Sequence, residues 1–368
     1  MKIALISCGR SDYSIYLPLI KKLKADDFFD LRIIAFGTHV SRFYNKTVDL
    51  FYKDDIKVDY EVESLVLGDS KEAISTAIGL TTIKFSSIWS IEKFDLIIIL
   101  GDRYEMFAAA SASVPFVIPI AHLHGGETTL GAFDDIFRHS ITLMSKIHFV
   151  TTDIHYKRVQ EILGKDEGIF NVGAPALDNI HDLKLLTKDE FEHNWGIRVD
   201  SDTILLTFHP ETIDISNSDL FLSEMFKSIK QIDKKFIITM PNNDTMGTEI
   251  RKKIIDFSKN NKKKYFVFEA LGTIGYYSAM KHCLCLIGNS SSGIIEAASF
   301  QKFVINIGNR QKGRACSKNV FHCSSSSQII DAYNKITKNQ HFTGNNVYGN
   351  GDSSKKIVNI LKNFNNVQ

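Results

Sequence analysis

Short apolar runs separated by helix-length segments limit the folds open to this chain more than any other feature of its sequence. Runs that are apolar nearly throughout are typical of parallel strands with both faces covered. The first half contains six of them, at residues 2–7, 31–37, 94–102, 116–123, 146–152 and 168–173. Between the first two runs, Ile15, Leu19, Ile20 and Leu23 fall on one face of a helix. The pattern predicts a βαβ unit at the start of the chain.

The same pattern begins again in the second half, at residues 203–210, 235–242, 265–271, 282–289 and 303–309. The polar stretch 178–201 between the two series has no strand pattern and is the predicted linker. We therefore predict an α/β protein of two Rossmann-like doubly wound lobes that face a cleft, with ligand at the carboxyl ends of the strands. The predicted limits are 1–178 and 179–352, and a C-terminal helix and tail at 353–368 pack back on the first lobe.

The charge balance excludes broad electrostatic binding. The 368 residues contain 44 Lys and Arg against 42 Asp and Glu, a net charge of +2. So small a charge gives no extended field for nucleic acid or an anionic membrane, and neither is an expected partner. An anionic ligand must be held by local groups.

The cysteines and the N-terminus indicate a cytoplasmic location. The five cysteines are an odd number without C-x-x-C spacing, which argues against a disulfide framework or a zinc site. The first residues, MKIALISCGR, lack the longer apolar core and cleavage site of a signal peptide. No apolar run approaches the length that spans a bilayer.

Polar residues gather just after the predicted strands, where a doubly wound sheet binds its ligands. These places are residues 9–14, 101–105, 122–139, 209–211, 288–296 and 308–314.

The segment GNSSSGIIEA (288–297) follows a strand and begins a predicted helix. Unpaired N–H groups at a helix start, together with Ser290 and Ser291, form a cradle for phosphate oxygens, and the glycines allow close approach. Glu296 would repel a phosphate, so a ribose hydroxyl suits it better. The combination indicates a nucleoside diphosphate. Helix capping alone explains the same residues equally well.

Arginines stand after strands in both lobes. Arg10 follows the first strand and Arg310 follows the last, and a planar guanidinium suits a diphosphate. A single loop arginine is usually only solvated, whereas several at strand ends indicate an anion site. His209 follows the first strand of the second lobe, either as a donor to the diphosphate or as a capped loop histidine.

Acidic groups gather in the first lobe. Asp102 ends an apolar strand, either as a helix N-cap or as an acid/base group. The next strand is followed by HLHGGETTLGAFDDIFRH (122–139), and neighbouring strands would set this loop beside Asp102. Carboxylates that share a partly desolvated site have their pKa values pushed apart, which lets one site hold an acid and a base. The H-x-H pair His122 and His124 is a possible metal chelate, but only loop acids would complete it, and we predict no metal.

These segments together resemble the hydrolysing UDP-N-acetylglucosamine 2-epimerases, the family of bacterial sialic-acid-pathway enzymes. The resemblance covers nearly the whole chain. It rests on GRSDYS, GDRYE, HLHGGE with DDIFRHSIT, TFHPET, MPNND, GNSSSGIIEA and INIGNRQKGR, in that order. Each motif is weak by itself, but the ordered set is specific.

The resemblance implies a GT-B fold and an enzyme that releases UDP from UDP-N-acetylglucosamine with inversion at C2, giving N-acetylmannosamine. The substrate-binding residues it implies are Arg10, Ser14, Arg103, Arg138, Asn242, Ser290, Ser291, Gly293, Glu296 and Arg310, and the catalytic ones are Asp102, His124, Glu127, Asp134 and His209. Many relatives carry Glu where this chain has His124. The second acid/base group is therefore either His124 or Glu127.

The expected chemistry is anti elimination to a glycal by Asp102 or Asp134, followed by addition of water. It needs no cofactor, and the first βα turn lacks G-x-G-x-x-G. The substrate is UDP-N-acetylglucosamine or UDP-N,N'-diacetylbacillosamine. A GT-B glycosyltransferase and a non-catalytic nucleotide-sugar binder are the other functions considered. We expect a homodimer or homotetramer.

Overall fold

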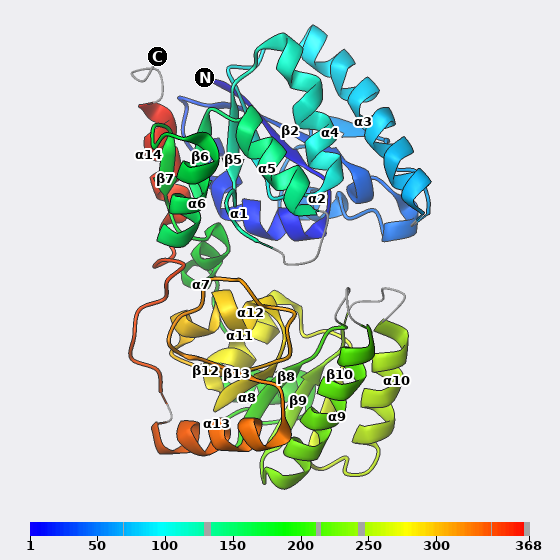
Figure 1. Ribbon diagram of the computed structural model, residues 1–368, viewed down its shortest axis with the longest axis vertical. Coiled ribbons are helices and arrows are strands. Elements are labelled where there is room, and N and C mark those ends of the chain that lie inside the picture. Colours follow the sequence, from blue (N-terminus) through cyan, green and yellow to red (C-terminus); the bar gives the residue numbers. More distant parts are fainter. Residues whose placement is uncertain (69, 129–133, 211–214, 242–246, 340, 364–368) are drawn as a thin grey trace. The chain divides into compact units, whose positions relative to one another are not determined.

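The computed structural model describes residues 1–68, 70–128, 134–210, 215–241, 247–339 and 341–363. It divides into two compact units (Figure 1). Unit 1 consists of Met1–Asn179 and Tyr348–Gln368, and unit 2 of Ile180–Val347. The structure thus places residues 348–352 with unit 1, whereas the sequence analysis left them with the second lobe. Tyr348 is buried, and its carbonyl accepts a hydrogen bond of 2.7 Å from the N–H of Ala174.

Unit 1 is built on a seven-stranded parallel sheet in the order β3-β2-β1-β4-β5-β6-β7. The order reverses beside β1, as in a doubly wound fold. Its strands are β1 (Lys2–Ser7), β2 (Asp30–Phe36), β3 (Tyr60–Val62), β4 (Leu96–Leu100), β5 (Ile120–Leu123), β6 (Ile147–Val150) and β7 (Ile169–Asn171). Its helices are α1 (Arg10–Lys24), α2 (Asp49–Lys53), α3 (Lys71–Ile91), α4 (Tyr104–Ser113), α5 (Asp134–Met144), α6 (Asp153–Leu163) and α14 (Ser353–Lys362), with 3-10 turns η1 (Gly37–His39), η2 (Arg42–Tyr44), η3 (Val114–Phe116) and η4 (Pro175–Leu177).

Both faces of this sheet are covered. On one face Tyr16 and Leu19 of α1 pack with Phe51 of α2 and with Leu361 of α14. On the other face lie the side chains of α3, α4 and α5, among them Phe85. The strands therefore sit between two apolar layers, which explains why the sequence runs are continuous rather than alternating.

The C-terminal helix α14 is fastened to unit 1 at its first turn. The backbone N–H groups of Ser353 and Ser354 donate to the two carboxylate oxygens of Asp178, at 3.0 and 2.6 Å. A helix start leaves such N–H groups unpaired, so a buried carboxylate from another segment caps it.

Helix α1 contains a proline that the chain accommodates locally. Pro18 has no N–H, so the carbonyl of Ser14, four residues earlier, loses its helical donor. The side-chain amide of Asn179 donates to that carbonyl at 2.8 Å instead. The Ser14 hydroxyl donates to the carbonyl of Ser11 at 2.8 Å.

Unit 2 repeats the architecture with a six-stranded parallel sheet in the order β10-β9-β8-β11-β12-β13. Its strands are β8 (Thr203–Thr207), β9 (Lys235–Thr239), β10 (Tyr265–Phe268), β11 (Cys285–Gly288), β12 (Phe303–Ile307) and β13 (Val320–Cys323). Its helices are α8 (Lys188–Trp195), α9 (Ile215–Gln231), α10 (Gly247–Ser258), α11 (Gly272–His282), α12 (Ser291–Ile295) and α13 (Ser326–Asn339), with the 3-10 turn η5 (Ala297–Phe300). Helix α7 (Asp178–Asp182) begins in unit 1 and ends in unit 2.

Two Rossmann-like lobes were predicted, and this fold class is confirmed. The strand predicted at 116–123 starts only at Ile120. Val117 has a left-handed φ of 56°, and Pro119 has no N–H to donate to a neighbouring strand. The edge strands β3 and β13 were not predicted.

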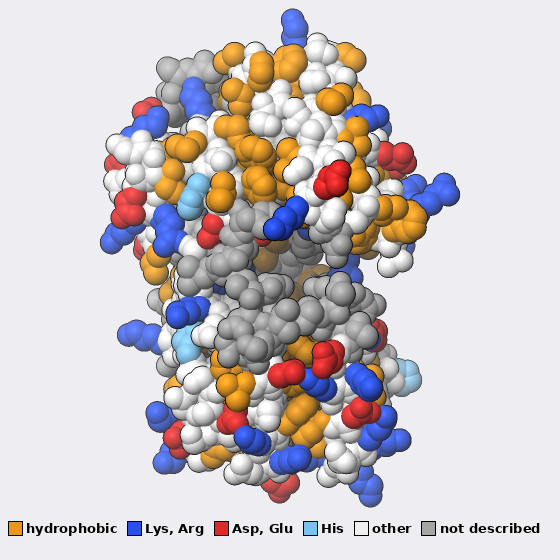
Figure 2. Space-filling model, turned by 45° about the vertical axis from the view of Figure 1, so that its right-hand side comes forward, with side chains coloured by type: hydrophobic (Ala, Val, Ile, Leu, Met, Phe, Trp, Pro, Cys, Tyr) orange, Lys and Arg blue, Asp and Glu red, His pale blue; other side chains and the backbone are white. Residues whose placement is uncertain are grey.

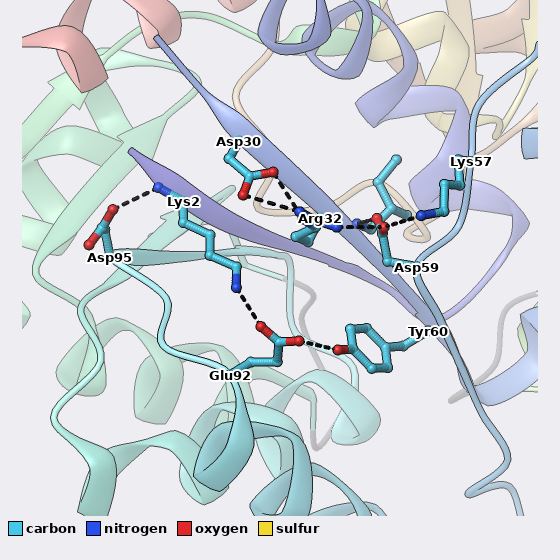
Figure 3. A network of polar contacts seen from close by, with 9 residues as sticks. Lys2, Asp30, Arg32, Lys57, Asp59, Tyr60, Glu92 and Asp95 are labelled. Carbon is cyan, nitrogen blue, oxygen red and sulfur yellow. Dashed lines mark hydrogen bonds and ion pairs between the residues drawn. The ribbon is translucent and has the colours of Figure 1, made fainter. Parts of the chain in front are cut away.

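The amino ends of the unit 1 strands carry exposed ion pairs (Figure 3). Arg32 at the start of β2 pairs with Asp30 at 2.9 Å and with Asp59 at 3.4 Å. The backbone N–H of Lys2 donates to Asp95, just before β4, at 2.6 Å. The side chain of Arg32 is 39% exposed, so these contacts are largely screened by water.

The side of unit 1 that carries α3 displays apolar side chains to solvent (Figure 2). Those more than half exposed include Ile83 and Ile91 on α3, Val117 after η3, and Ile136 and Leu143 on α5. Exposed apolar clusters often mark contacts between proteins. The homodimer or homotetramer nevertheless stays a prediction.

None of the helices formed by described residues combines the length and the apolar character that crossing a membrane requires. The five cysteines, all within the described ranges, are free thiols.

Candidate active site

Asp102 follows β4 at the carboxyl edge of the unit 1 sheet and forms an ion pair with Arg138 of α5. The Arg138 side chain is only 6% exposed, and that of Asp102 is 21% exposed. A second guanidinium nitrogen, Nη1, donates to the carbonyl of His124 at 2.8 Å. One buried cation therefore joins the residue after β4 to the loop after β5.

His124 and Glu127 form a second buried pair in the loop after β5. The ring atom Nδ1 of His124 donates to Oε1 of Glu127 at 2.7 Å. The same oxygen accepts the hydroxyl of Thr151, the first residue after β6, at 3.0 Å. Burial pushes the pKa of Glu127 upward, but the charge and hydrogen bond of His124 and the charge of Arg138 outweigh it, so this pKa lies below its ordinary value. Glu127 is therefore an ionised acceptor.

Asp134 begins α5 and is coupled to Asp102. Its pKa is raised, first by burial and then by the negative charge of Asp102. The pKa values of two carboxylates in one partly desolvated site are pushed apart, as the sequence predicts. The result is a carboxylate of raised pKa near one that is paired with Arg138.

His122 is tied into the fold through both ring nitrogens. Its Nε2 donates to the carbonyl of Gly101 at 2.8 Å, and its Nδ1 accepts the hydroxyl of Thr142 at 3.2 Å. Burial lowers the pKa of His122 to about 3, so the ring is neutral at physiological pH. This histidine fixes the residue that precedes Asp102. Both ring nitrogens of His122 are used in these hydrogen bonds, so the ring is not oriented to chelate a metal together with His124.

Three buried polar atoms in this region find no hydrogen-bond partner among the described residues. They are His124 Nε2, Thr128 Oγ1 and Arg138 Nε. Buried polar atoms are nearly always paired, so a group of unpaired ones calls for an explanation such as a bound ligand.

Arg103 lies near the end of β1 and is held by its own neighbour. It forms two hydrogen bonds to Glu105, at 2.6 and 3.2 Å. A Cβ built on Gly9 would lie 2.9 Å from Oγ1 of Thr38 and 4.0 Å from Nη1 of Arg103, so the glycine makes room for Thr38, and Arg103 lies at contact distance from the turn after β1. Arg10 and Ser14 are exposed on the first turns of α1.

In unit 2, the segment after β11 makes a close turn against β8. Gly288 has a φ of 136°, and a Cβ there would lie 1.9 Å from the carbonyl oxygen of Thr207. Ser290 caps α12 by accepting the N–H of Ser292 at 3.3 Å. The helix predicted after GNSSSG is the five-residue α12, which is followed by the 3-10 turn η5. Gly293 lets this turn pack on β12, where a Cβ would meet Val304 at 3.0 Å.

Glu296, at the end of α12, accepts a hydrogen bond from the hydroxyl of Ser292. Its pKa is raised because burial outweighs the hydrogen bonds of Ser292 and Tyr277. A carboxyl group with reduced negative charge suits the neighbourhood of a hydroxyl-bearing ligand.

Asn289 organises the rest of the unit 2 site. Its side chain accepts the N–H of His209 at 2.7 Å and donates to the carbonyl of His209 at 2.8 Å. Its own carbonyl accepts Arg310 at 3.2 Å and Gln311 at 2.8 Å. The ends of β8, β11 and β12 thereby bring His209, Ser290 and Arg310 to one edge of the sheet.

Asn242, predicted as a nucleotide contact, lies outside the described residues. Sequence reasoning missed the positioning roles of Thr151, Thr142, Asn289 and Gln311. Each lies in or beside a segment already singled out, but neutral side chains carry no charge pattern that would distinguish them.

Comparison with known proteins now identifies the relatives of this chain. The family model described as UDP-N-acetylglucosamine 2-epimerase matches residues 21–362. The chain belongs to this family. As a member of it, the protein is an enzyme of the hydrolysing nucleotide-sugar 2-epimerase class, and the resemblance inferred from the motifs is confirmed.

Curated relatives cover nearly the whole chain. The GDP/UDP-N,N'-diacetylbacillosamine 2-epimerase (hydrolyzing) of Campylobacter jejuni is 34% identical over 91% of this chain and 87% of that protein. The UDP-N,N'-diacetylbacillosamine 2-epimerase (hydrolyzing) of Legionella pneumophila is 31% identical over 98% of this chain and 95% of that protein.

Among solved structures, the UDP-GlcNAc 2-epimerase of Neisseria meningitidis bound to UDP-GlcNAc has a TM-score of 0.79 at 19% identity. The comparison covers 98% of this 2-epimerase and 100% of that chain. At this identity the match supports the two-lobe GT-B fold.

Proposed function

We propose that the protein converts a UDP-linked 2-acetamido sugar to UDP and the free sugar inverted at C2. Family membership supports the reaction class. The observation that carries the proposal is the buried cluster of Asp102, Arg138, His124, Glu127 and Asp134, which holds acid/base groups of different basicity at the carboxyl edge of one sheet.

The substrate we propose is UDP-N,N'-diacetylbacillosamine or UDP-N-acetylglucosamine. The relatives at 34% and 31% identity are named for the first sugar, whereas a UDP-N-acetylglucosamine 2-epimerase of Neisseria meningitidis is 26% identical. The higher identities favour the diacetylated sugar. A relative named polysialic acid biosynthesis protein P7, 30% identical, is compatible with a role in making sialic-acid-type sugars.

In this proposal unit 2 binds the nucleotide. Ser290, Ser291 and Arg310 donate to the diphosphate, with His209 as a further donor, and Glu296 accepts the ribose hydroxyls. The proposed role of Gly293 is to keep this turn close to the sheet. Arg10, Ser14, Arg103 and Asn242 are the remaining proposed contacts to the substrate. Donors that bind the diphosphate more tightly as charge develops on it assist its departure.

Unit 1 carries out the proton transfers. The C2 proton is only weakly acidic, so the base and the leaving group must act together. The Asp102 and Asp134 pair removes this proton, and the electrons of the C–H bond form the C1–C2 double bond as the C1–O bond to UDP breaks. The raised pKa of Asp134 suits it to accept this proton. Arg138 is a further proposed substrate contact, and its ion pair also positions Asp102.

The deciding experiment is incubation with each UDP-sugar in deuterated water. We expect free UDP and a C2-inverted sugar with deuterium at C2, without an added acceptor. Unlabelled product with retained configuration, or UDP release only when an acceptor sugar is supplied, would instead indicate a hydrolase or a glycosyltransferase. The comparison of the two substrates decides which sugar the pocket accepts.

A further inference from the structure

His124 adopts a backbone conformation that is rare for a residue with a side chain. Its φ is 65°, in the left-handed region. The strained turn is held from both sides: its N–H donates to the carbonyl of Phe149 at 3.1 Å, and its carbonyl accepts Arg138 at 2.8 Å. A strained conformation that surrounding contacts enforce is common where a side chain must be aimed at a reaction.

A chain of hydrogen bonds fixes the His124 ring. Glu127 Oε1 accepts Nδ1–H of His124 at 2.7 Å and the hydroxyl of Thr151 at 3.0 Å. Since Thr151 has one hydroxyl proton, its oxygen accepts from Nδ1–H of His155 at 2.7 Å. Glu127 therefore receives two donors and holds one ring proton of His124 on Nδ1, so any second ring proton is carried on Nε2.

The opposite ring atom, Nε2, is buried and has no partner within the described part of the chain. His124 as a whole is 8% exposed. Arg138 contacts the backbone carbonyl of His124 and the carboxylate of Asp102 through different nitrogens, so one guanidinium ties the loop that carries His124 to Asp102.

The two groups have partners of opposite charge. The guanidinium of Arg138 pairs with Asp102, whereas the carboxylate of Glu127 accepts Nδ1–H of His124. Inversion at C2 requires that the proton leaves one face of the sugar and another returns to the opposite face. The geometry thus provides one acceptor and one donor, as such a reaction needs.

We propose that Nε2 of His124 donates the proton to C2 in the second half of the reaction, with Glu127 and Thr151 as positioning residues. This inference rests on the proposed function. In the step, the electrons of the C1–C2 double bond of the glycal form the new C2–H bond with the imidazolium proton. Water adds its oxygen to C1 and gives up a proton to the Asp102 and Asp134 pair, which has by then released the original C2 proton to solvent. The step leaves the free sugar and a neutral His124, which takes up a proton from solvent before the next turnover.

The test separates the two halves of the reaction. The His124→Gln enzyme is given the UDP-sugar, and separately the corresponding 2-acetamido glycal with UDP, and products are followed by proton NMR. We expect UDP release to fall less than tenfold while the glycal accumulates, and glycal hydration to fall at least about 100-fold. His341→Gln, an exposed histidine of unit 2, is the matched control and should behave as wild type.

Hydration of the glycal at the wild-type rate would overturn the inference, as would a folded His124→Gln enzyme that loses both half-reactions equally. If this variant does not fold, Thr151→Val and Thr151→Ser decide the question. Thr151→Val should raise the ratio of released glycal to released sugar, and Thr151→Ser should keep the wild-type ratio. A wild-type ratio in both variants overturns the positioning role. Failure of the wild-type enzyme to release UDP from either UDP-sugar would refute the proposed function itself, whatever the variants do.

Discussion

The carboxyl ends of the two sheets carry different kinds of side chain. In unit 1 they hold buried charges, the pair of Asp102 with Arg138 and the pair of His124 with Glu127. In unit 2 they hold neutral hydroxyls and amides, such as Ser290 and Asn289, with an exposed arginine at the rim. The two sheets share the same kind of strand order. The topology therefore decides where a site lies, and the side chains decide what the site does.

The difference indicates a division of labour. Acid/base groups in a partly desolvated site can transfer protons, whereas hydroxyl and amide groups bind a nucleotide and stabilise the charge that develops on it. The residue types in a charged pair do not by themselves distinguish a functional pair from one that only stabilises the fold. The amino ends of the unit 1 strands carry Arg–Asp pairs as well, but they are exposed (Figure 3).

The sharpest test of this division uses the two ends of strand β4. We expect Asp102→Asn to lower turnover about 1,000-fold, because it removes a proton acceptor, while UDP affinity changes less than threefold. Asp95→Asn, at the amino end of the same strand, should leave turnover unchanged. Steady-state rates and calorimetric UDP titration measure both. Near-normal turnover in Asp102→Asn would assign the base to Asp134 alone.

The second test compares two arginines that differ in exposure. Arg138→Met removes a buried guanidinium from an Asp102 side chain that is 21% exposed and should cost about 3 kcal/mol of unfolding free energy. Arg32→Met removes an arginine that is 39% exposed and should cost less than about 1 kcal/mol. Urea unfolding of both variants gives the comparison. Equal losses would mean that burial does not distinguish the two edges of the sheet.

The third test addresses unit 2. The double variant Ser290→Ala, Arg310→Ala should weaken UDP binding about 10- to 100-fold, since a hydrogen bond to a charged group contributes about 1.5–3 kcal/mol. Lys312→Ala, an exposed cation two residues from Arg310, is the control for loss of general positive charge. Equal weakening in the control would show that the diphosphate is attracted only by the net field. Hydration of a supplied glycal should not fall in the double variant.

The sequence predicted the positions of these groups better than their contacts. Apolar runs predicted the approximate positions of eleven strands, because a strand that is buried on both faces has a continuous apolar sequence. Edge strands β3 and β13 were missed because each is short and only partly apolar. Each of them forms by pairing with a neighbouring strand, β2 or β12, and has no continuous apolar run of its own.

The candidate site shows the same limit. The motifs brought Asp102, His124 and Glu127 to attention, but the ion pair between Asp102 and Arg138 spans 36 residues. The left-handed backbone of His124 has no local sequence cue either. Such contacts depend on how α5 packs on the sheet, and the local sequence pattern does not reveal that packing.

The last test of this comparison concerns acid stability. Unit 1 contains four buried histidines whose pKa values burial lowers, to about 3 for His122 and about 4 for His39, His148 and His155. The unfolded chain binds these protons near pH 6.5, so the folded state is fully stable above that pH and loses stability as the pH falls from 6.5 toward 4. Each uncoupled group contributes about 1.4 kcal/mol per pH unit in this window.

The two tryptophans allow this loss to be assigned to a unit, because Trp89 lies in unit 1 and Trp195 in unit 2. In a Trp195→Phe background, fluorescence follows unit 1, and His39→Gln should reduce the pH dependence of its unfolding by about one proton. His341→Gln, exposed in unit 2, should not change it. If unit 2, followed by Trp195 in a Trp89→Phe background, loses stability at the same pH and with the same slope, buried histidines do not set the acid limit of unit 1. The contrast between a charged, titrating unit and a neutral one would then hold for catalysis but not for stability.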